Sequence, residues 1–247
     1  MVMAQSTPRV WLITGSSTGF GRAMVEEVLL NGEIAVATLR KPSVLDDLVA
    51  RYPRTQLLVL PLDVTNEVQV KSAFVQAKDT FGHVDVVYNN AGQVLFQELE
   101  GGTNGPCQGA DGSLDSFTEV LAQELLPAWN IRIVNVHPGS TRTPLMLSEM
   151  LEPPALYASE PTAVTTKLRA EADTLIASDA LIGVEAVTKR IWSVTRMDNE
   201  DLRKGMQEGI PGLVNMHTGM DSLGRVHAKI GRLQGELMWN MKVHYEH

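Results

Sequence analysis

Near its N-terminus the chain reads Val10-Trp11-Leu12-Ile13-Thr14-Gly15-Ser16-Ser17-Thr18-Gly19-Phe20-Gly21. A short apolar run of strand type enters a loop with the spacing Gly-x-x-x-Gly-x-Gly, and an amphipathic helical pattern follows to Asn31. At such a junction, free backbone N–H groups and the positive end of the helix dipole can face a pyrophosphate. Gly15 and Gly19 permit a tight turn, and Gly21 permits close packing of the helix on the strand. The alternative is an ordinary strand-to-helix turn with three glycines.

Outward from this junction, short apolar runs alternate with longer amphipathic ones. The predicted strands are 10–13, 34–39, 57–62, 84–88 and 131–136, and the predicted helices are 22–31, 45–51, 66–81, 114–126, 179–194 and 220–242. This alternation predicts an α/β fold with a doubly wound, Rossmann-type parallel sheet. Residues 93–113 predict an irregular connection, and residues 141–178 a polar segment interrupted by prolines. We expect one domain over 1–247, with a cofactor-binding core at 9–139 and a substrate-covering segment and C-terminal helix at 140–247.

The composition excludes several classes of function. The 247 residues carry a formal net charge of −8 without a block of five like charges, which argues against nucleic acid as a partner. The single cysteine, Cys107, cannot form an internal disulfide and lacks companions for a zinc site, so we expect no metal. The sequence has neither the pattern of a signal peptide nor an apolar run of membrane-spanning length. We therefore expect a soluble, cytoplasmic protein with no membrane partner.

Arg40, followed by Lys41, stands at the end of the second predicted strand. An acidic residue there would hold a free ribose 2′-hydroxyl and repel a 2′-phosphate, whereas a guanidinium can pair with that phosphate. We therefore expect NADP(H) to be preferred over NAD(H). The alternative is that Arg40 is a solvated loop charge.

Four motifs in the chain resemble those of the short-chain dehydrogenases/reductases: Thr14 to Gly21, Asp63-Val64, Asn89-Asn90-Ala91-Gly92 and Pro138-Gly139. The resemblance implies that Asp63 contacts the adenine ring, that residues 90–92 line the adenine-ribose side, and that residues 138–141 meet the nicotinamide. The candidate cofactor-binding residues are Ile13, Gly15, Ser17, Gly19, Phe20, Gly21, Arg40, Asp63, Asn90, Ala91, Gly92, Thr141 and Thr143.

The catalytic Tyr-x-x-x-Lys motif of that family is missing, because no tyrosine of the chain has a lysine four residues later. Residues 114–136 resemble the family helix that follows the lysine, together with the next strand. Only 20 residues, 93–112, then stand where the family has a helix, a strand with a serine, and the start of the tyrosine helix. Such a stretch needs upward of ~30 residues. We therefore expect that one helix–strand unit is deleted after the fourth strand, and that oligomerisation is altered because one interface helix is missing.

Two residues are candidates to supply a proton in place of the missing tyrosine. His137 ends a predicted strand at the edge where doubly wound folds bind ligands, although a hydrogen-bonded histidine beside a turn fits the same position. Tyr157 lies in the proline-rich segment that is expected to cover the substrate.

The resemblance implies NADP(H)-dependent interconversion of a secondary alcohol and a ketone. Apolar side chains at residues 145–147, 150 and 151 predict a small lipophilic substrate, and a role in specialised (secondary) metabolism is a further expectation. Two alternatives stay open. One is a nucleotide-binding pseudoenzyme that kept the glycine loop and lost its proton relay, and the other is a splice or gene-model variant whose missing exon held the catalytic residues.

Overall fold

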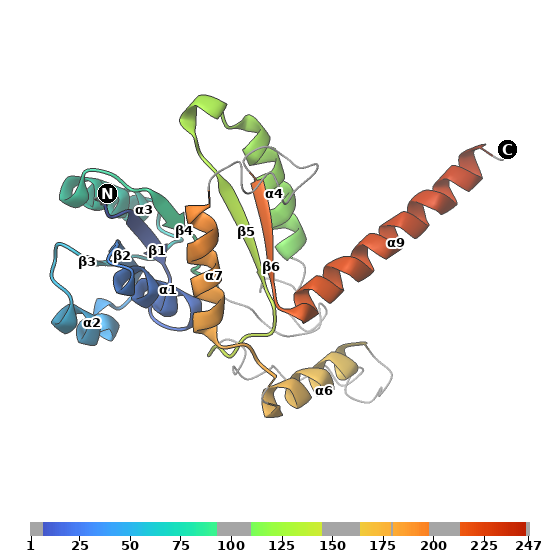
Figure 1. The fold of residues 1–247 in the computed structure, drawn as a ribbon, viewed down its shortest axis with the longest axis horizontal. Coiled ribbons are helices and arrows are strands. Elements are labelled where there is room, and N and C mark those ends of the chain that lie inside the picture. The colour runs from blue at the N-terminus through green and yellow to red at the C-terminus, as the bar shows by residue number, and fades with distance from the viewer. Residues whose placement is uncertain (1–6, 93–109, 145–163, 179, 198–212, 246–247) are drawn as a thin grey trace, which may run out of the picture. The chain divides into compact units, whose positions relative to one another are not determined.

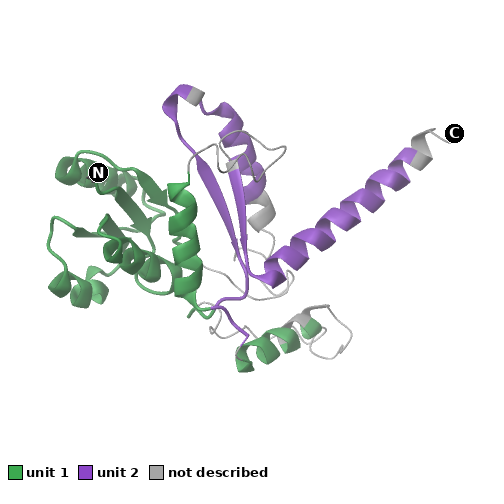
Figure 2. Ribbon diagram, viewed as in Figure 1, with its two compact units in different colours: residues 1–108, 142–179, 183–197 green, residues 109–141, 180–182, 198–247 purple. Residues whose placement is uncertain are grey.

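The computed structural model describes residues 7–92, 110–144, 164–178, 180–197 and 213–245. The contacts divide the chain into two compact units, coloured separately in Figure 2. Unit 1 comprises residues 1–108, 142–179 and 183–197, and unit 2 comprises residues 109–141, 180–182 and 198–247. The chain passes between the units several times, so the expected single domain with one division at residue 139 stays a prediction.

Figure 1 shows the elements of both units. The strands of unit 1 are β1 (Val10–Thr14), β2 (Ile34–Leu39), β3 (Leu57–Pro61) and β4 (Val86–Tyr88). Its helices are α1 (Gly19–Leu30), α2 (Asp46–Arg51), α3 (Glu67–Phe81), α6 (Val164–Ala177) and α7 (Val184–Arg196), with a 3-10 helix at Pro42–Leu45. Unit 2 contains α4 (Ala110–Glu124), a 3-10 helix at Pro127–Trp129, β5 (Ile133–Pro138), β6 (Leu213–Thr218) and α9 (Met220–Tyr245).

The strands of unit 1 form a parallel sheet in the order β3-β2-β1-β4. Val10 pairs with Ile34 on one side of β1, and Leu12 pairs with Val87 on the other. The chain builds outward from β1 in both directions, so the carboxyl ends of β1 and β4 form a topological switch point. Open α/β sheets bind their ligands at such points. The expected α/β fold with a parallel sheet is confirmed.

Helices cover both faces of this sheet. Successive side chains of a strand point to opposite faces, so neighbouring residues of β1 pack against different helices. On one face, Val10 and Leu12 pack in a buried cluster with Ala73 and Ala77 of α3. Trp11 is one residue out of phase with these strand residues and belongs to the other face, where α1 packs on β1 and α7 packs on α1. The glycine loop therefore joins β1 to α1, a helix that packs on the sheet on one side and on α7 on the other.

Glu33, which lies just before β2, ties α7 to the sheet. Its side chain is 2% exposed, and its carboxylate accepts hydrogen bonds from Arg9 (2.8 Å) and from Arg196 of α7 (2.6 Å). The indole nitrogens of Trp11 (2.8 Å) and Trp192 (2.9 Å) donate to it as well. Burial by itself would raise the pKa of Glu33, but the hydrogen bonds from Arg9, Arg196 and Trp192 outweigh burial and lower it.

The core of unit 2 is a pair of parallel strands, β5 and β6, in which His137 lies opposite His217. Helix α4 packs on this pair, and the amide of Asn135 donates to the Thr118 hydroxyl of α4 (2.6 Å). The same amide donates to the Asn215 side chain of β6 (3.2 Å). In the described residues β5 pairs only with β6, and β4 only with β1.

Two elements differ from the sequence-based expectation. The predicted strands do not include β6, because its six residues alternate only in part between apolar and polar side chains and its partner strand lies far away in sequence. Helix α6 lies in the proline-interrupted segment, where the sequence predicted no helix. A helix can form there because all the prolines of that segment precede Val164. No helix in the described ranges is long and apolar enough to cross a bilayer.

Candidate functional site

The glycine loop, residues 14–21, has the conformation that its glycines permit. Gly15 and Gly19 have φ angles of +67° and +54°, in the left-handed region that residues with side chains rarely adopt. A Cβ on Gly15 would stand 2.8 Å from Cα of Ala91. A Cβ on Gly21 would collide with the carbonyl oxygen of Gly15 and stand 2.6 Å from the amide nitrogen of Asn90. Close approach of the loop to β4 therefore requires glycine at both positions.

Thr14 and Asn90 fasten the loop to the end of β4. The hydroxyl of Thr14 accepts hydrogen bonds from the backbone N–H groups of Asn90 and Ala91, both at 3.0 Å. In return, the Asn90 side-chain amide donates to the carbonyl oxygens of Thr14 (3.0 Å) and Gly15 (3.3 Å). Sequence reasoning missed Thr14 as a site residue. A threonine at the end of the first strand, directly before the first glycine, was the available signal.

The other side of the loop is fastened to β2. The backbone N–H of Ser16 donates to the Thr38 carbonyl (3.1 Å), and the Ser16 and Thr38 hydroxyls both donate to the Ile13 carbonyl (3.0 Å each). Ile13 and Ser16 are fully buried, whereas Ser17 and Phe20 are partly exposed. Ile13 thus anchors the loop from the buried side through its carbonyl oxygen, and the residues after Ser16 form the solvent-facing side of the loop.

The first turn of α1 lacks a side-chain cap. Thr18 occupies the N-cap position in an extended conformation, and its side chain makes no capping hydrogen bond. The N–H groups of that turn therefore retain the capacity to bind an anion. Thr143 and Pro144 lie beside the same turn, since a Cβ on Gly19 would be 3.7 Å from an atom of each. The structure thereby brings Thr143, predicted from a distant part of the sequence, to the glycine loop.

Two charged residues follow the neighbouring strands β2 and β3. Arg40 is exposed, and no hydrogen bond or ion pair to it is found among the described residues. Oδ1 of Asp63 accepts from the backbone N–H (2.9 Å) and hydroxyl (2.8 Å) of Thr65. These hydrogen bonds, with a smaller contribution from the charge of Arg40, lower the pKa of Asp63 and keep it anionic. Oδ2 of Asp63 remains available to accept from a ligand.

The remaining predicted residues are distributed as follows. Gly92 is exposed at the end of a described segment, and Thr141 belongs to unit 2, where its buried hydroxyl donates to the Gly139 carbonyl (2.8 Å). Tyr157 lies outside the described residues. His137, also in unit 2, stacks on His217 with ring centroids 4.5 Å apart, and its Nε2 lies 3.5 Å from Oδ1 of Asp115.

The partner of His137 has a defined hydrogen-bonding state. The Ser222 hydroxyl donates its proton to the His137 carbonyl oxygen (3.0 Å). Nδ1 of His217 lies 3.0 Å from the Ser222 hydroxyl oxygen, which can therefore only accept from it, so Nδ1 carries the imidazole proton. Burial, and next the neighbouring His137, lower the pKa of His217. His217 is therefore neutral near pH 7, with Nε2 as its unprotonated nitrogen.

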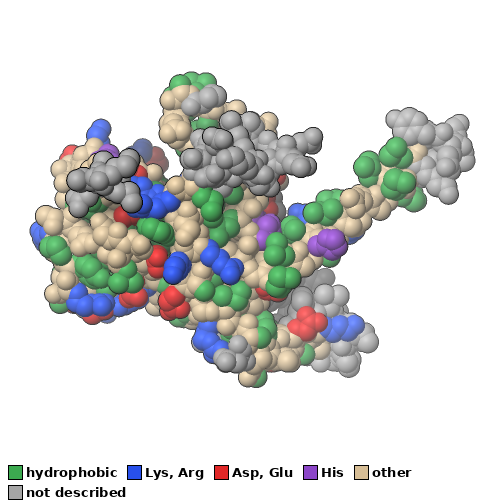
Figure 3. Space-filling model, viewed as in Figure 1, with side chains coloured by type: hydrophobic (Ala, Val, Ile, Leu, Met, Phe, Trp, Pro, Cys, Tyr) green, Lys and Arg blue, Asp and Glu red, His purple; other side chains and the backbone are tan. Residues whose placement is uncertain are grey.

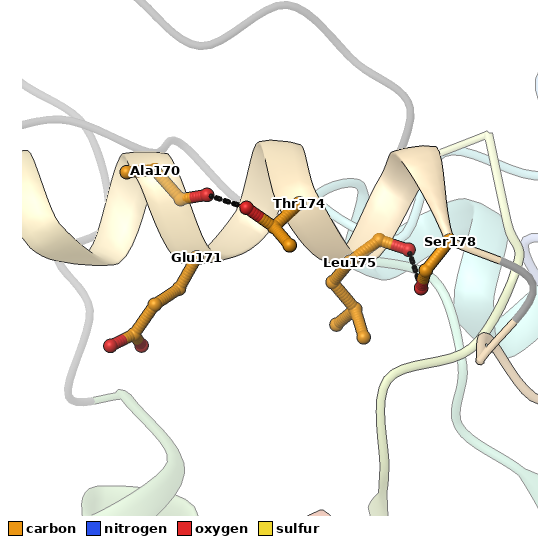
Figure 4. A pocket seen from close by; sticks show the side chains of 5 residues that line it. All are labelled: Ala170, Glu171, Thr174, Leu175 and Ser178. Carbon is orange, nitrogen blue, oxygen red and sulfur yellow. Dashed lines mark hydrogen bonds between the residues drawn. The ribbon is translucent and has the colours of Figure 1, made fainter.

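A shallow pocket of about 340 Å³ lies on α6 (Figure 4). It is lined by Ala170, Glu171, Thr174, Leu175 and Ser178. Thr174 donates to the Ala170 carbonyl (2.7 Å) and Ser178 to the Leu175 carbonyl (2.8 Å), so both hydroxyls are used within the helix. This surface has none of the convergent polar groups that a ligand site requires.

A family model described as short chain dehydrogenase matches residues 9–104. "Oxidoreductase BOA17" of Botryotinia fuckeliana (strain B05.10) is 41% identical over 92 residues, covering 37% of this chain and 34% of that protein. "Uncharacterized oxidoreductase C162.03" of Schizosaccharomyces pombe is 30% identical over 195 residues, covering 59% of this chain and 65% of the relative. The chain thus spans about a third of the first relative and less than two thirds of the second.

Two solved structures share the fold over most of the chain. A short-chain dehydrogenase from Streptomyces avermitilis is 22% identical, with a TM-score of 0.74 over 97% of this chain and 98% of that one. The 3-ketoacyl-(acyl-carrier-protein) reductase from Brucella melitensis, solved with NADH, is 19% identical, with a TM-score of 0.61 over 86% of this chain and 98% of that one. At these identities the likeness establishes the fold.

Proposed function

We propose that the chain is an NADP(H)-dependent oxidoreductase that interconverts a secondary alcohol and a ketone, as the match of residues 9–104 to the short chain dehydrogenase model suggests. The observation that carries the proposal is the glycine loop of unit 1. It approaches β4 so closely that a Cβ on Gly15 or Gly21 would collide with neighbouring atoms, and it leads into a helix turn without a side-chain cap. This is the arrangement that a dinucleotide pyrophosphate requires.

In this proposal the residues of unit 1 divide the cofactor between them. The backbone of the loop and the first turn of α1 hold the pyrophosphate, with Ser17 and Phe20 on its outer side. Asp63 binds the adenine amino group through its free oxygen, and the backbone at Ala91 and Gly92 lines the ribose. Asn90 acts indirectly, because its side chain is occupied in holding Thr14 and Gly15.

Arg40 would select the phosphorylated cofactor. It is exposed at the carboxyl end of β2, which in this fold is the side of the adenine ribose. Because Arg40 makes no hydrogen bond or ion pair within the described part of the chain, its guanidinium can pair with a 2′-phosphate through two hydrogen bonds. The Brucella melitensis reductase was solved with NADH, so its likeness does not favour NADP(H), and this part of the proposal rests on Arg40.

The test is a titration of the purified chain with NADPH and with NADH. We expect NADPH to bind at least about tenfold more tightly, and an Arg40→Asp variant to reverse the preference, because a carboxylate accepts from the 2′-hydroxyl and repels the phosphate. Arg54→Asp is the matched control. It makes the same charge change just before the N-terminal end of β3, at the opposite edge of the parallel sheet from Arg40, and should leave the preference for NADPH unchanged. Equal affinities of the parent for both cofactors would refute the role of Arg40.

When bound, the reduced nicotinamide would supply a hydride to the ketone while the protein supplies a proton, and in the reverse direction the oxidised nicotinamide would accept the hydride while the protein accepts the proton. We propose His137 or Tyr157 as its source, because the family tyrosine and lysine are missing. Nε2 of His137 lies 3.5 Å from Oδ1 of Asp115, a carboxylate that can orient the imidazole ring. Lacking a tuned general acid, the chain should turn over about 10²–10⁴ times more slowly than an enzyme that has one.

This proposal is tested with a panel of small lipophilic ketones and saturating NADPH. His137→Gln and Tyr157→Phe should be assayed separately, and the variant of the true donor should lose most of the parent's kcat without a large change in KM. Full kcat in both variants would exclude both residues.

A second candidate function is nucleotide binding without catalysis. The observation that favours it is the loss of Tyr-x-x-x-Lys while the glycine loop and its fastenings are intact. Tight NADPH binding without turnover on the ketone panel would support it. A transcript that encodes additional residues between 92 and 113 would instead support a splice or gene-model variant. A cytoplasmic location and a role in secondary metabolism remain part of the proposal.

A further inference from the structure

Helix α9 of unit 2 carries an apolar seam with the spacing of a coiled coil. Aliphatic residues recur at alternating steps of three and four, followed by one amide, at Leu223, Val226, Ile230, Leu233, Leu237 and Asn240. This period of 3.5 residues keeps one stripe facing a partner helix over three heptads. The seam is about 27 Å long at 1.5 Å per residue.

The seam is exposed in the structure. Leu223 is 45% exposed, Ile230 and Leu233 are each 49% exposed, and Leu237 is 60% exposed. In the space-filling view, apolar side chains recur along α9 (Figure 3). A row of half-exposed large aliphatic residues of this length is a feature of association surfaces.

The composition of α9 also calls for a partner. Gly224, Gly231 and Gly235 lie within the helix, and a Cβ on any of them would meet no atom within 4 Å. Close packing therefore does not explain these glycines, and each weakens the helix relative to alanine. Isolated helices are marginal in water even without such residues, so burial of the seam would have to supply the missing stability.

We propose that the seam of α9 pairs with the seam of α9 from a second copy of the chain, in an antiparallel two-stranded coiled coil. In this arrangement Ile230 faces Leu233 of the second copy, and Val226 faces Leu237 of the second copy. Two-fold symmetry repeats each layer, so all the aliphatic seam residues of both copies are covered. Asn240 then lies in the outermost layers, which are open to water.

The flanking charges fix the orientation. Lys229 and Glu236 occupy the same flanking position in successive heptads and are both exposed. In an antiparallel pair these positions face each other, so Lys229 of each copy meets Glu236 of the other. In a parallel pair Lys229 would face Gln234, and Glu236 would face Met241, with no opposite charge on either side. Charge complementarity thus favours the antiparallel pair.

The first experiment measures the mass of the full chain by sedimentation over a range of concentrations. The parent should show a monomer–dimer equilibrium. Leu233→Asp should weaken dimerisation at least about 100-fold, because one substitution removes two buried leucines from a symmetric pair. Ala228→Asp, on the outer side of the same helix, is the matched control and should leave the equilibrium within about threefold of the parent.

The second experiment tests orientation by charge reversal. Lys229→Glu and Glu236→Lys should each weaken dimerisation about threefold to tenfold, and the double variant should recover the parent's affinity. Recovery requires that the two residues face each other, and a parallel pair would not provide it. Helix content from circular dichroism, measured on each variant at equal mass concentration, separates loss of pairing from general unfolding.

Two results would overturn the proposal. The first is a parent that remains a monomer at every concentration, and a loss of stability in urea on Leu233→Asp would then indicate that a segment of the same chain covers the seam. The second is a dimer that persists in Leu233→Asp, because another surface would then hold it.

Discussion

Gly21 occupies a position where the usual effect of alanine on a helix should be reversed. Alanine in place of glycine in an open helix stabilises by up to ~1 kcal/mol. At Gly21 the added Cβ would meet the Gly15 carbonyl oxygen and the Asn90 amide. We expect Gly21→Ala to lower the free energy of unfolding by about 1–3 kcal/mol, because the loop must move to make room. Urea unfolding of the purified chain measures this directly.

Gly231→Ala is the control for that substitution, since its Cβ meets nothing within 4 Å and it should stabilise α9. Gly21→Ala should also weaken NADPH binding at least about tenfold, because the loop that moves is the one proposed to hold the pyrophosphate. A Gly21→Ala chain as stable as the parent would contradict the packing described for this loop.

Sequence reasoning identified the glycines at this scale but not the hydrogen bonds that Asn90 and Thr14 make. The expectation that Asn90 lines the ribose stays a prediction, and in the structure its side-chain amide donates to the carbonyl oxygens of Thr14 and Gly15. Thr14 was not singled out, although its hydroxyl accepts two backbone N–H groups. Both roles depend on which strand lies beside β1. The sequence pattern leaves this pairing undetermined.

At the scale of elements, the attachment of α7 to the rest of unit 1 depends on Glu33. Glu33→Gln keeps the shape of the side chain but removes the charge that Arg9 and Arg196 share. Both arginines are partly exposed, so water offsets some of the loss, and we expect about 2–3 kcal/mol of destabilisation in urea unfolding. Glu26→Gln on α1, where Glu26 is 41% exposed and pairs with Arg22, should cost less than ~1 kcal/mol.

The same carboxylate makes the stability of unit 1 depend on pH. The pKa of Glu33 is lower in the folded chain than its ordinary value of 4.5. The folded state therefore binds fewer protons than the unfolded state as pH falls below 4.5, and stability is lost towards the lowered pKa. Unfolding at pH 7 and at pH 3 should reveal a steeper loss in the parent than in Glu33→Gln. Equal slopes would mean that Glu33 is not the group responsible.

The sequence predicted the N-terminal elements better than the later ones for a physical reason. β1 to β4 with α1 and α3 combine buried runs, glycine stops and the Asn66 cap, which accepts from the Gln69 backbone (3.1 Å). These signals are local. β6 is recognisable only through its pairing with β5 some 80 residues earlier in the chain, as in the Asn135–Asn215 hydrogen bond, and local periodicity does not reveal it.

At the scale of the whole molecule, the two compact units contribute different residues to the proposed function. Unit 1 contains the glycine loop, Arg40, Asp63 and Thr143, while unit 2 contains His137, Thr141 and the seam of α9. The family model ends at residue 104, close to where the sequence analysis places the missing helix–strand unit. In the proposed function, cofactor binding and proton supply therefore fall largely to different residues, and we expect the first to persist without the second.

Cofactor binding by the glycine loop can be measured by calorimetric titration of NADPH into the purified full chain. We expect saturable binding of one NADPH per chain, retained in His137→Gln and weakened in Gly21→Ala. A parent that is folded by circular dichroism and yet gives no saturable binding of NADPH or NADH would refute the proposed nucleotide site.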